Sequence, residues 1–160
     1  MLEQKLKTIA PNAEVNNASI SGDTTSGGRS RLAALLSRHQ PQIVIIELGG
    51  NDALRGLALS MSQANLTAMV EQAQKNQAKV ILIGMQIPPN YGREYGQTFK
   101  DMFKEVSLAK QTALVPFLLE GLSPQNEMFQ PDGIHPNETA QPIMMETVLK
   151  VLLPVLKEFD

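Results

Sequence analysis

The feature that most constrains this chain is an alternation between short, continuous apolar runs and longer stretches with helical periodicity. Three apolar runs predict strands: Ile43–Leu48, Lys79–Gly84 and Ala113–Val115. Nearly continuous β-branched runs are typical of parallel strands that are covered on both faces. Val15–Ile20 is a weaker strand candidate, because its two asparagines are poor strand residues.

The stretches between these runs are predicted to be helices. Three of them carry apolar stripes at i, i+3, i+4 and i+7: Leu32, Leu35, Leu36 and His39; Leu66, Met69, Val70 and Ala73; and Phe99, Met102, Phe103 and Val106. A helical pattern already begins at Met1, and a last helix is expected over Thr139–Phe159, with Pro154 kinking or ending it. This alternation predicts one α/β domain with an open parallel sheet and helices on both faces.

Composition and charge exclude several function classes. With 14 basic and 16 acidic side chains the net charge is −2, so no basic surface for nucleic acid is expected. The longest apolar runs are too short to cross a bilayer, and the first residues do not resemble a signal peptide. The absence of cysteine from these residues excludes disulfides, thiolate zinc sites and cysteine nucleophiles.

Candidate site residues are expected in the loops beyond the carboxyl ends of the strands. In the loop Ser21–Gly28, Gly22 and Gly27 have the glycine spacing of a phosphate-binding P-loop. The two residues after Gly27 are Gly and Arg, where that motif has Lys and a hydroxyl residue, which disfavours phosphate binding. Two interpretations remain: a turn capped by Thr25 or Ser26, or a loop that presents the backbone N–H of Gly22 to an anion.

The second candidate is Asn51, in the turn that follows the run Ile43–Leu48. A partly buried side-chain amide at this place would be a strong hydrogen-bond donor. Gly, Asn and Asp are also the residues that an ordinary tight turn prefers. Both interpretations of Asn51 stay open.

The third candidate is the pair Asp132 and His135, which lies ahead of the last helix. A carboxylate at this spacing can accept the Nδ1–H of the imidazole, which fixes the tautomer and leaves Nε2 as a general base. The alternatives are an Asp–His metal pair without further ligands, or turn and cap roles for Asp132 and Asn137. His39, the other histidine, ends a helical stripe, so no histidine-rich metal site is expected.

Three segments resemble, in order, the second, third and fifth sequence blocks of the SGNH (GDSL-type) hydrolase family: Asn17–Thr24, Glu47–Asp52 and Asp132–Pro136. The similarity is greatest to the bacterial arylesterase, thioesterase I and lysophospholipase branch, and it covers essentially the whole chain. It implies a flavodoxin-like, three-layer α/β/α fold. It also implies hydrolysis of small acyl esters, lysophospholipids or thioesters through an acyl-serine, without a cofactor or metal.

The same resemblance implies residue roles. The backbone N–H of Gly22 and the side-chain amide of Asn51 correspond to oxyanion-hole donors. His135 corresponds to the general base, and Asp132 to the carboxylate that orients it. The residues expected to line the acyl groove are Leu54, Leu57, Ile87 and Tyr91.

One family block has no counterpart in these 160 residues: the Gly-Asp-Ser block that follows the first strand and carries the nucleophile. The segment Gly22-Asp23-Thr24 mimics it, but its flanks match the second block, so Thr24 is not expected to be the nucleophile. The nearby serines, Ser19, Ser21 and Ser26, have no better claim. Residues 1–160 are therefore expected to be one SGNH-hydrolase-like domain, truncated at the N-terminus and impaired as a serine ester hydrolase.

The missing first strand would be central in a flavodoxin-like sheet of order 2-1-3-4-5. Its loss would remove stabilisation comparable to that of a whole domain, about 5–15 kcal/mol. One of three outcomes is therefore expected: a sequence begun at an internal Met, a sheet closed up around the gap, or self-association that fills it. The competing class of function is a non-catalytic α/β module that binds an acyl or carboxylate ligand. The family resemblance also suggests a periplasmic or secreted location.

Overall fold

The computed structural model describes residues 1–122 and 127–159. Its centre is a parallel sheet in the order β1-β2-β3, formed by Ile43–Ile46, Lys79–Ile83 and Ala113–Val115. In the register of this sheet, Leu82 of β2 lies between Ile46 and Leu114. The three strands expected from apolar runs therefore form, and they pair in parallel as the alternation predicts.

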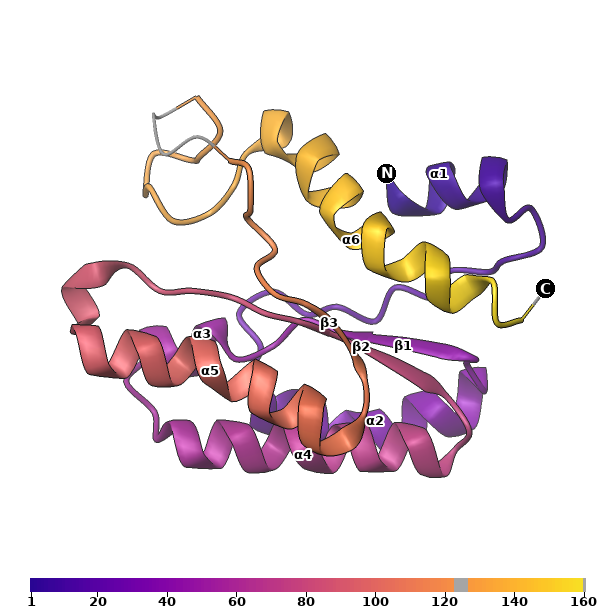
Figure 1. The fold of residues 1–160 in the computed structure, drawn as a ribbon, viewed down its shortest axis with the longest axis horizontal. Coiled ribbons are helices and arrows are strands. Elements are labelled where there is room, and N and C mark those ends of the chain that lie inside the picture. The colour runs from indigo at the N-terminus through magenta and orange to yellow at the C-terminus, as the bar shows by residue number, and fades with distance from the viewer. Residues whose placement is uncertain (123–126, 160) are drawn as a thin grey trace.

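Helices cover both faces of this sheet (Figure 1). The helices are α1 (Leu2–Ile9), α2 (Thr25–His39), α3 (Gly50–Leu54), α4 (Leu59–Lys75), α5 (Arg93–Lys110) and α6 (Gln141–Leu156), with short 3-10 turns η1 (Pro89–Tyr91) and η2 (Glu138–Ala140). Helices α2, α4 and α5 lie on one face, and α1 and α6 lie on the other. The arrangement is the three-layer α/β/α architecture expected above.

The core is divided into two apolar clusters by the sheet. Val80 and Leu82 belong to the cluster under α2, α4 and α5, whereas Ile81 and Ile83 belong to the cluster under α1 and α6. These four β2 side chains are all buried, two on each face, since successive residues of a strand point to opposite faces. β2 is therefore covered on both faces, as its apolar run predicts.

The prediction that Ile43–Leu48 is covered on both faces is wrong. β1 ends at Ile46, lies at the edge of the sheet, and leaves Ile45 39% exposed. The weaker strand prediction, Val15–Ile20, is also wrong, because this segment has no strand structure and Ile20 is 58% exposed. A strand needs a hydrogen-bonded neighbour, and Val15–Ile20 does not pair with the edge of β1, so the sheet does not close up in that way.

Helix ends differ from the expectations in small ways. The side chain of Thr24, not of Thr25 or Ser26, caps α2 by accepting a hydrogen bond from Gly27 N–H. Pro154 lies inside α6, which continues to Leu156. His39 is the last residue of α2, as its position in the stripe indicates.

Among the described residues, the stretch Glu138–Leu156 has the length and composition of a membrane-crossing helix, with 19 residues and a mean hydropathy of 1.2. Its Leu149, Leu152 and Val155 are buried in the cluster that covers the sheet. A core helix that packs on a sheet can have the same apolar composition as a membrane-crossing helix. The expectation that the chain has no membrane span stays a prediction.

Candidate active site

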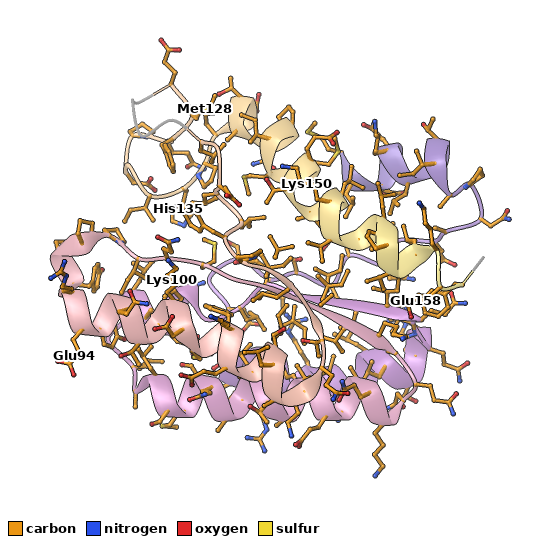
Figure 2. All side chains as sticks on the ribbon, viewed as in Figure 1. Glu94, Lys100, Met128, His135, Lys150 and Glu158 are labelled. Atoms are coloured by element: carbon orange, nitrogen blue, oxygen red, sulfur yellow. The ribbon has the colours of Figure 1, made fainter. Side chains whose placement is uncertain are left out.

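Asp132 and His135 form a hydrogen-bonded pair on the loop ahead of α6, and Figure 2 shows His135 on this loop. The Oδ2 atom of Asp132 lies 2.7 Å from Nδ1 of His135. The Oδ1 atom accepts the backbone N–H groups of Ile134 at 2.9 Å and His135 at 3.0 Å. Gly133 makes this tight turn possible, because its φ of +68° is unfavourable for other residues. One carboxylate oxygen is thus anchored and the other faces the imidazole.

These contacts stabilise the ionised carboxylate. The backbone N–H groups of His135 and Ile134, followed by the His135 side chain, lower the pKa of Asp132 from 3.8 to about 2. The pair is open to solvent, with 64% of the His135 side chain and 45% of the Asp132 side chain exposed. No described residue hydrogen-bonds to Nε2 of His135. The imidazole is therefore oriented through Nδ1, with Nε2 available for proton transfer.

Asn51 lies in the first turn of α3, rather than in a loop, directly beyond the carboxyl end of β1. Its Nδ2 donates to the backbone carbonyl of Asp23 at 3.0 Å. Gly49 begins the helix with a φ of +112°, and its Cα faces the buried rings of Phe99 and Phe103. The buried rings and the helix turn hold the Asn51 amide at the end of the sheet.

Gly22 lies in the loop that enters α2 and has a φ of +76°. Its backbone N–H makes no hydrogen bond to any described residue. Its carbonyl oxygen accepts a hydrogen bond from an Nη atom of Arg55 at 2.9 Å. The loop thus presents an N–H group that no described residue uses, next to a carbonyl that Arg55, at the end of α3, holds in place.

Sequence reasoning missed the buried group that connects these two loops. The carboxylate of Asp52, next to Asn51, accepts the backbone N–H and the hydroxyl of Thr25 at 2.9 and 2.5 Å. Ser62 donates a third hydrogen bond at 3.0 Å. An Asp in a turn such as Gly49–Asp52 is common, so no signal in the sequence distinguishes this buried carboxylate from an ordinary turn residue.

The residues expected to line an acyl groove lie around the end of α3 and the start of α5. The hydroxyl of Tyr91 donates to the carbonyl of Leu54 at 3.3 Å. Leu57 is 44% exposed, and Ile87 is half-buried against the core. Tyr95, which sequence reasoning missed, contacts the carbonyl of Leu57 at 3.1 Å, and burial raises the pKa of its hydroxyl. Two tyrosines thus tie the segment after Asn51 to η1 and to the start of α5.

The structure brings the site residues together as two pairs. One is Asp132 with His135, and the other is Asn51 with the Gly22–Asp23 loop. Helix α3, which carries Asn51, lies toward the left of Figure 1, and His135 lies toward the left of Figure 2, which has the same view. No hydrogen bond joins the two pairs among the described residues. The described residues also contain no group of three or more His, Asp or Glu side chains able to hold a metal ion.

Comparison with known proteins gives consistent results. The family model described as GDSL-like lipase/acylhydrolase matches residues 1–141. An esterase named TesA from Pseudomonas aeruginosa is 47% identical over 98% of this chain and 78% of its own length. Thioesterase 1/protease 1/lysophospholipase L1 of Escherichia coli K12 is 39% identical over 89% of this chain and 68% of its own. The psychrotrophic esterase EstA from Pseudoalteromonas sp. superposes with a TM-score of 0.91 at 36% identity, covering 98% of this chain and 85% of EstA.

Proposed function

This chain belongs to the GDSL-like lipase/acylhydrolase family and is by resemblance an esterase-type acyl hydrolase, and we propose that its described residues supply four parts of one acyl-transfer site. His135 is the general base, Asp132 orients it, and Gly22 N–H and the Asn51 amide bind the oxyanion. We propose that residues 1–160 act as one SGNH-hydrolase-like domain with a small acyl ester or thioester as substrate.

The observation that carries this proposal is the geometry of the Asp132–His135 pair. A carboxylate fixed by two backbone N–H groups holds the imidazole through Nδ1 at 2.7 Å. Nε2 then removes the proton of an attacking hydroxyl or water, and the ionised Asp132 stabilises the imidazolium that forms. The imidazolium afterwards protonates the leaving group.

The oxyanion is the second requirement of such a reaction. Negative charge develops on the carbonyl oxygen when the tetrahedral intermediate forms. The N–H of Gly22 is not used by any described residue, and the Asn51 amide has a second N–H beside the one bound to Asp23. These two donors would bind that oxygen.

The nucleophile is the part for which these residues offer no candidate, because no Gly-Asp-Ser block occurs in the sequence. With the remaining groups assembled, water attack assisted by His135 is expected, and residual rates of about 10³–10⁴ over uncatalysed hydrolysis are typical when a triad member is missing. Residues 1–160 are therefore expected to hydrolyse p-nitrophenyl butyrate slowly.

A matched pair of variants tests these roles. His135→Ala is expected to reduce the slow hydrolysis to the uncatalysed rate, whereas His39→Ala, at the far end of α2, is expected to retain it. Equal rates for the two variants would contradict the role of His135. Turnover as fast as that of a serine esterase would contradict the expectation that a nucleophile is lacking.

A second candidate function is a non-catalytic module that binds an acyl carboxylate. It is favoured by one observation: no described hydroxyl group is hydrogen-bonded to His135. In this case the Gly22 and Asn51 donors bind the carboxylate of a fatty acid without any cleavage step. Binding of octanoate without His135-dependent hydrolysis of p-nitrophenyl butyrate would support the binding module over the hydrolase.

The edge of the sheet suggests self-association as a further property. β1 has one edge without a strand partner among the described residues. Two large apolar residues, Ile45 on this strand and Ile20 in the segment before Gly22, are exposed. Unpaired strand edges are templates for pairing with another chain.

We also propose, from the family resemblance, a periplasmic or secreted location, which cell fractionation would test.

A further inference from the structure

Asp52 is an unusual residue for the interior of this protein. Its side chain is 3% exposed, and no described Lys, Arg or His forms an ion pair with it. Burial of a carboxylate is costly unless hydrogen bonds replace its hydration. Asp52 has three donors: Thr25 N–H, the Thr25 hydroxyl and the Ser62 hydroxyl.

The Thr25 contacts connect two elements that are far apart in sequence. Thr25 is the first residue of α2, and Asp52 lies in the first turn of α3. The hydroxyl of Thr25 also accepts a hydrogen bond from Asn65 at 3.1 Å. Thr25 Oγ1 is therefore committed as both donor and acceptor, which leaves this contact little freedom to move.

The loop that enters α2 is joined to α3 and to its C-cap residue at two further points. Asn51 donates to the carbonyl of Asp23 at 3.0 Å, and Arg55 donates to the carbonyl of Gly22 at 2.9 Å. The Asp52 contact is the buried one of the three, whereas the Arg55 contact is exposed. Since a hydrogen bond is electrostatically stronger in the low-dielectric interior, the Asp52 contact is the strongest of the three.

We propose that Asp52 is a positioning residue that sets the Gly22 N–H at a fixed distance from the Asn51 amide. This inference depends on the proposed function, in which those two groups are the oxyanion donors. Asp52 does not touch the substrate. It acts through Thr25, which begins the helix that follows Gly22, and through Asn51, its neighbour in the chain.

Because Asp52 is negatively charged, the proposal can be tested by whether its replacement strengthens or weakens anion binding. A negative side chain beneath an anion-binding site weakens anion binding through its field, so removing that charge alone would tighten binding. Loss of the Thr25 contact would instead let the two donors move apart and weaken binding. The two explanations therefore predict opposite signs.

The experiment compares the whole chain with Asp52→Asn and Ser62→Ala. Asp52→Asn keeps the shape and removes the charge, but it replaces one of the two acceptor oxygens by an NH₂ donor, so that one of the two Thr25 contacts is lost. Ser62→Ala removes one donor from the same buried carboxylate and keeps both Thr25 contacts. Thr25→Val, which removes the hydroxyl contacts to Asp52 and Asn65 and keeps the backbone contact, is the second variant if Asp52→Asn does not fold.

Two readouts are taken: octanoate affinity by NMR titration, and ¹⁵N relaxation of the Gly22 amide in the ligand-free protein. Asp52→Asn is expected to weaken octanoate binding about tenfold and to make Gly22 more mobile on the ps–ns timescale. Ser62→Ala is expected to leave both within about twofold of the parent, a difference well below 1 kcal/mol.

Unchanged or tighter octanoate binding by Asp52→Asn, with Gly22 as rigid as in the parent, would overturn the positioning role. Equal effects of Asp52→Asn and Ser62→Ala would also overturn it, because they would indicate general destabilisation. If the parent protein does not bind octanoate at all, the oxyanion role of Gly22 and Asn51 fails. The relaxation of Gly22 then decides the role of Asp52 independently.

Discussion

The Nδ2 atom of Asn51 lies 3.0 Å from the carbonyl oxygen of Asp23, 28 residues earlier in the chain. This hydrogen bond joins the first turn of α3 to the loop that enters α2. One N–H of the amide is used in it, and the other remains for a ligand. The two proposed oxyanion donors are thus parts of one hydrogen-bonded unit.

Replacement of Asn51 by Ala is expected to reduce the His135-dependent hydrolysis of p-nitrophenyl butyrate by about 10²–10³-fold. One oxyanion donor is worth about 10²–10³ in kcat, and the variant also loses the hydrogen bond to Asp23. Asn76→Ala, at the C-terminal end of α4, is the matched control. Retention of the parent rate by Asn51→Ala would remove Asn51 from the mechanism.

The Asp132 carboxyl is expected to titrate far below an ordinary aspartate. Its pKa is lowered from 3.8 to about 2 by backbone N–H groups and His135. Because the folded-state value is the lower one, the carboxylate stabilises the loop fully above about pH 4. This stabilisation is lost as the pH falls through about 2. A ¹³C NMR titration of the Asp132 carboxyl carbon measures the midpoint, and a midpoint near 3.8 would show that the backbone hydrogen bonds are absent in solution.

Gly84→Ala is expected to destabilise the fold. A Cβ at Gly84 would lie 2.4 Å from the carbonyl oxygen of Pro116, a backbone atom that cannot turn away. Overpacking of this kind costs about 1–3 kcal/mol, and about 2–4 °C of Tm is lost per kcal/mol in a chain of this size. Gly50→Ala is the control, because nothing lies within 4 Å of its added Cβ. Equal Tm values for the two variants, measured by circular dichroism, would contradict the close approach of the chain at Gly84.

Self-association through β1 is expected to be sensitive to charge at the edge. The parent protein is expected to show a mass above 17.5 kDa at high concentration in light scattering. Ile45→Lys places a charge on the edge strand at a partly exposed position, and lysine on an edge discourages strand pairing. The variant is therefore expected to be monomeric. A monomeric parent protein, or a variant that associates as strongly as the parent, would rule out this interface.

The strands and the long helices could be predicted from the sequence because their signals are local. The run at Lys79–Ile83 and the stripe ending at Val106 contain the information on their own structure. Exposure of Ile45 could not be predicted in this way. The same β-branched run suits a central or an edge strand, and the difference depends on whether another strand lies beside it.

The candidate site was predictable where its residues are close in sequence. Asp132 and His135 are three residues apart, so their contact follows from turn geometry. Asp52 and Thr25 are 27 residues apart, and their contact depends on how α3 is placed against α2. The tyrosine contact of Tyr95 to Leu57 was missed for the same reason.

His135, Gly22 and Asn51 are proposed to face one ligand, and a single NMR titration with octanoate can test this. The resonances of the His135 ring, the Gly22 amide and the Asn51 side-chain amide are followed in the same samples. If the three groups face one ligand, all three resonances shift along one binding curve with a shared Kd. A His135 ring that does not respond while Gly22 and Asn51 do, or that follows a different Kd, would contradict it.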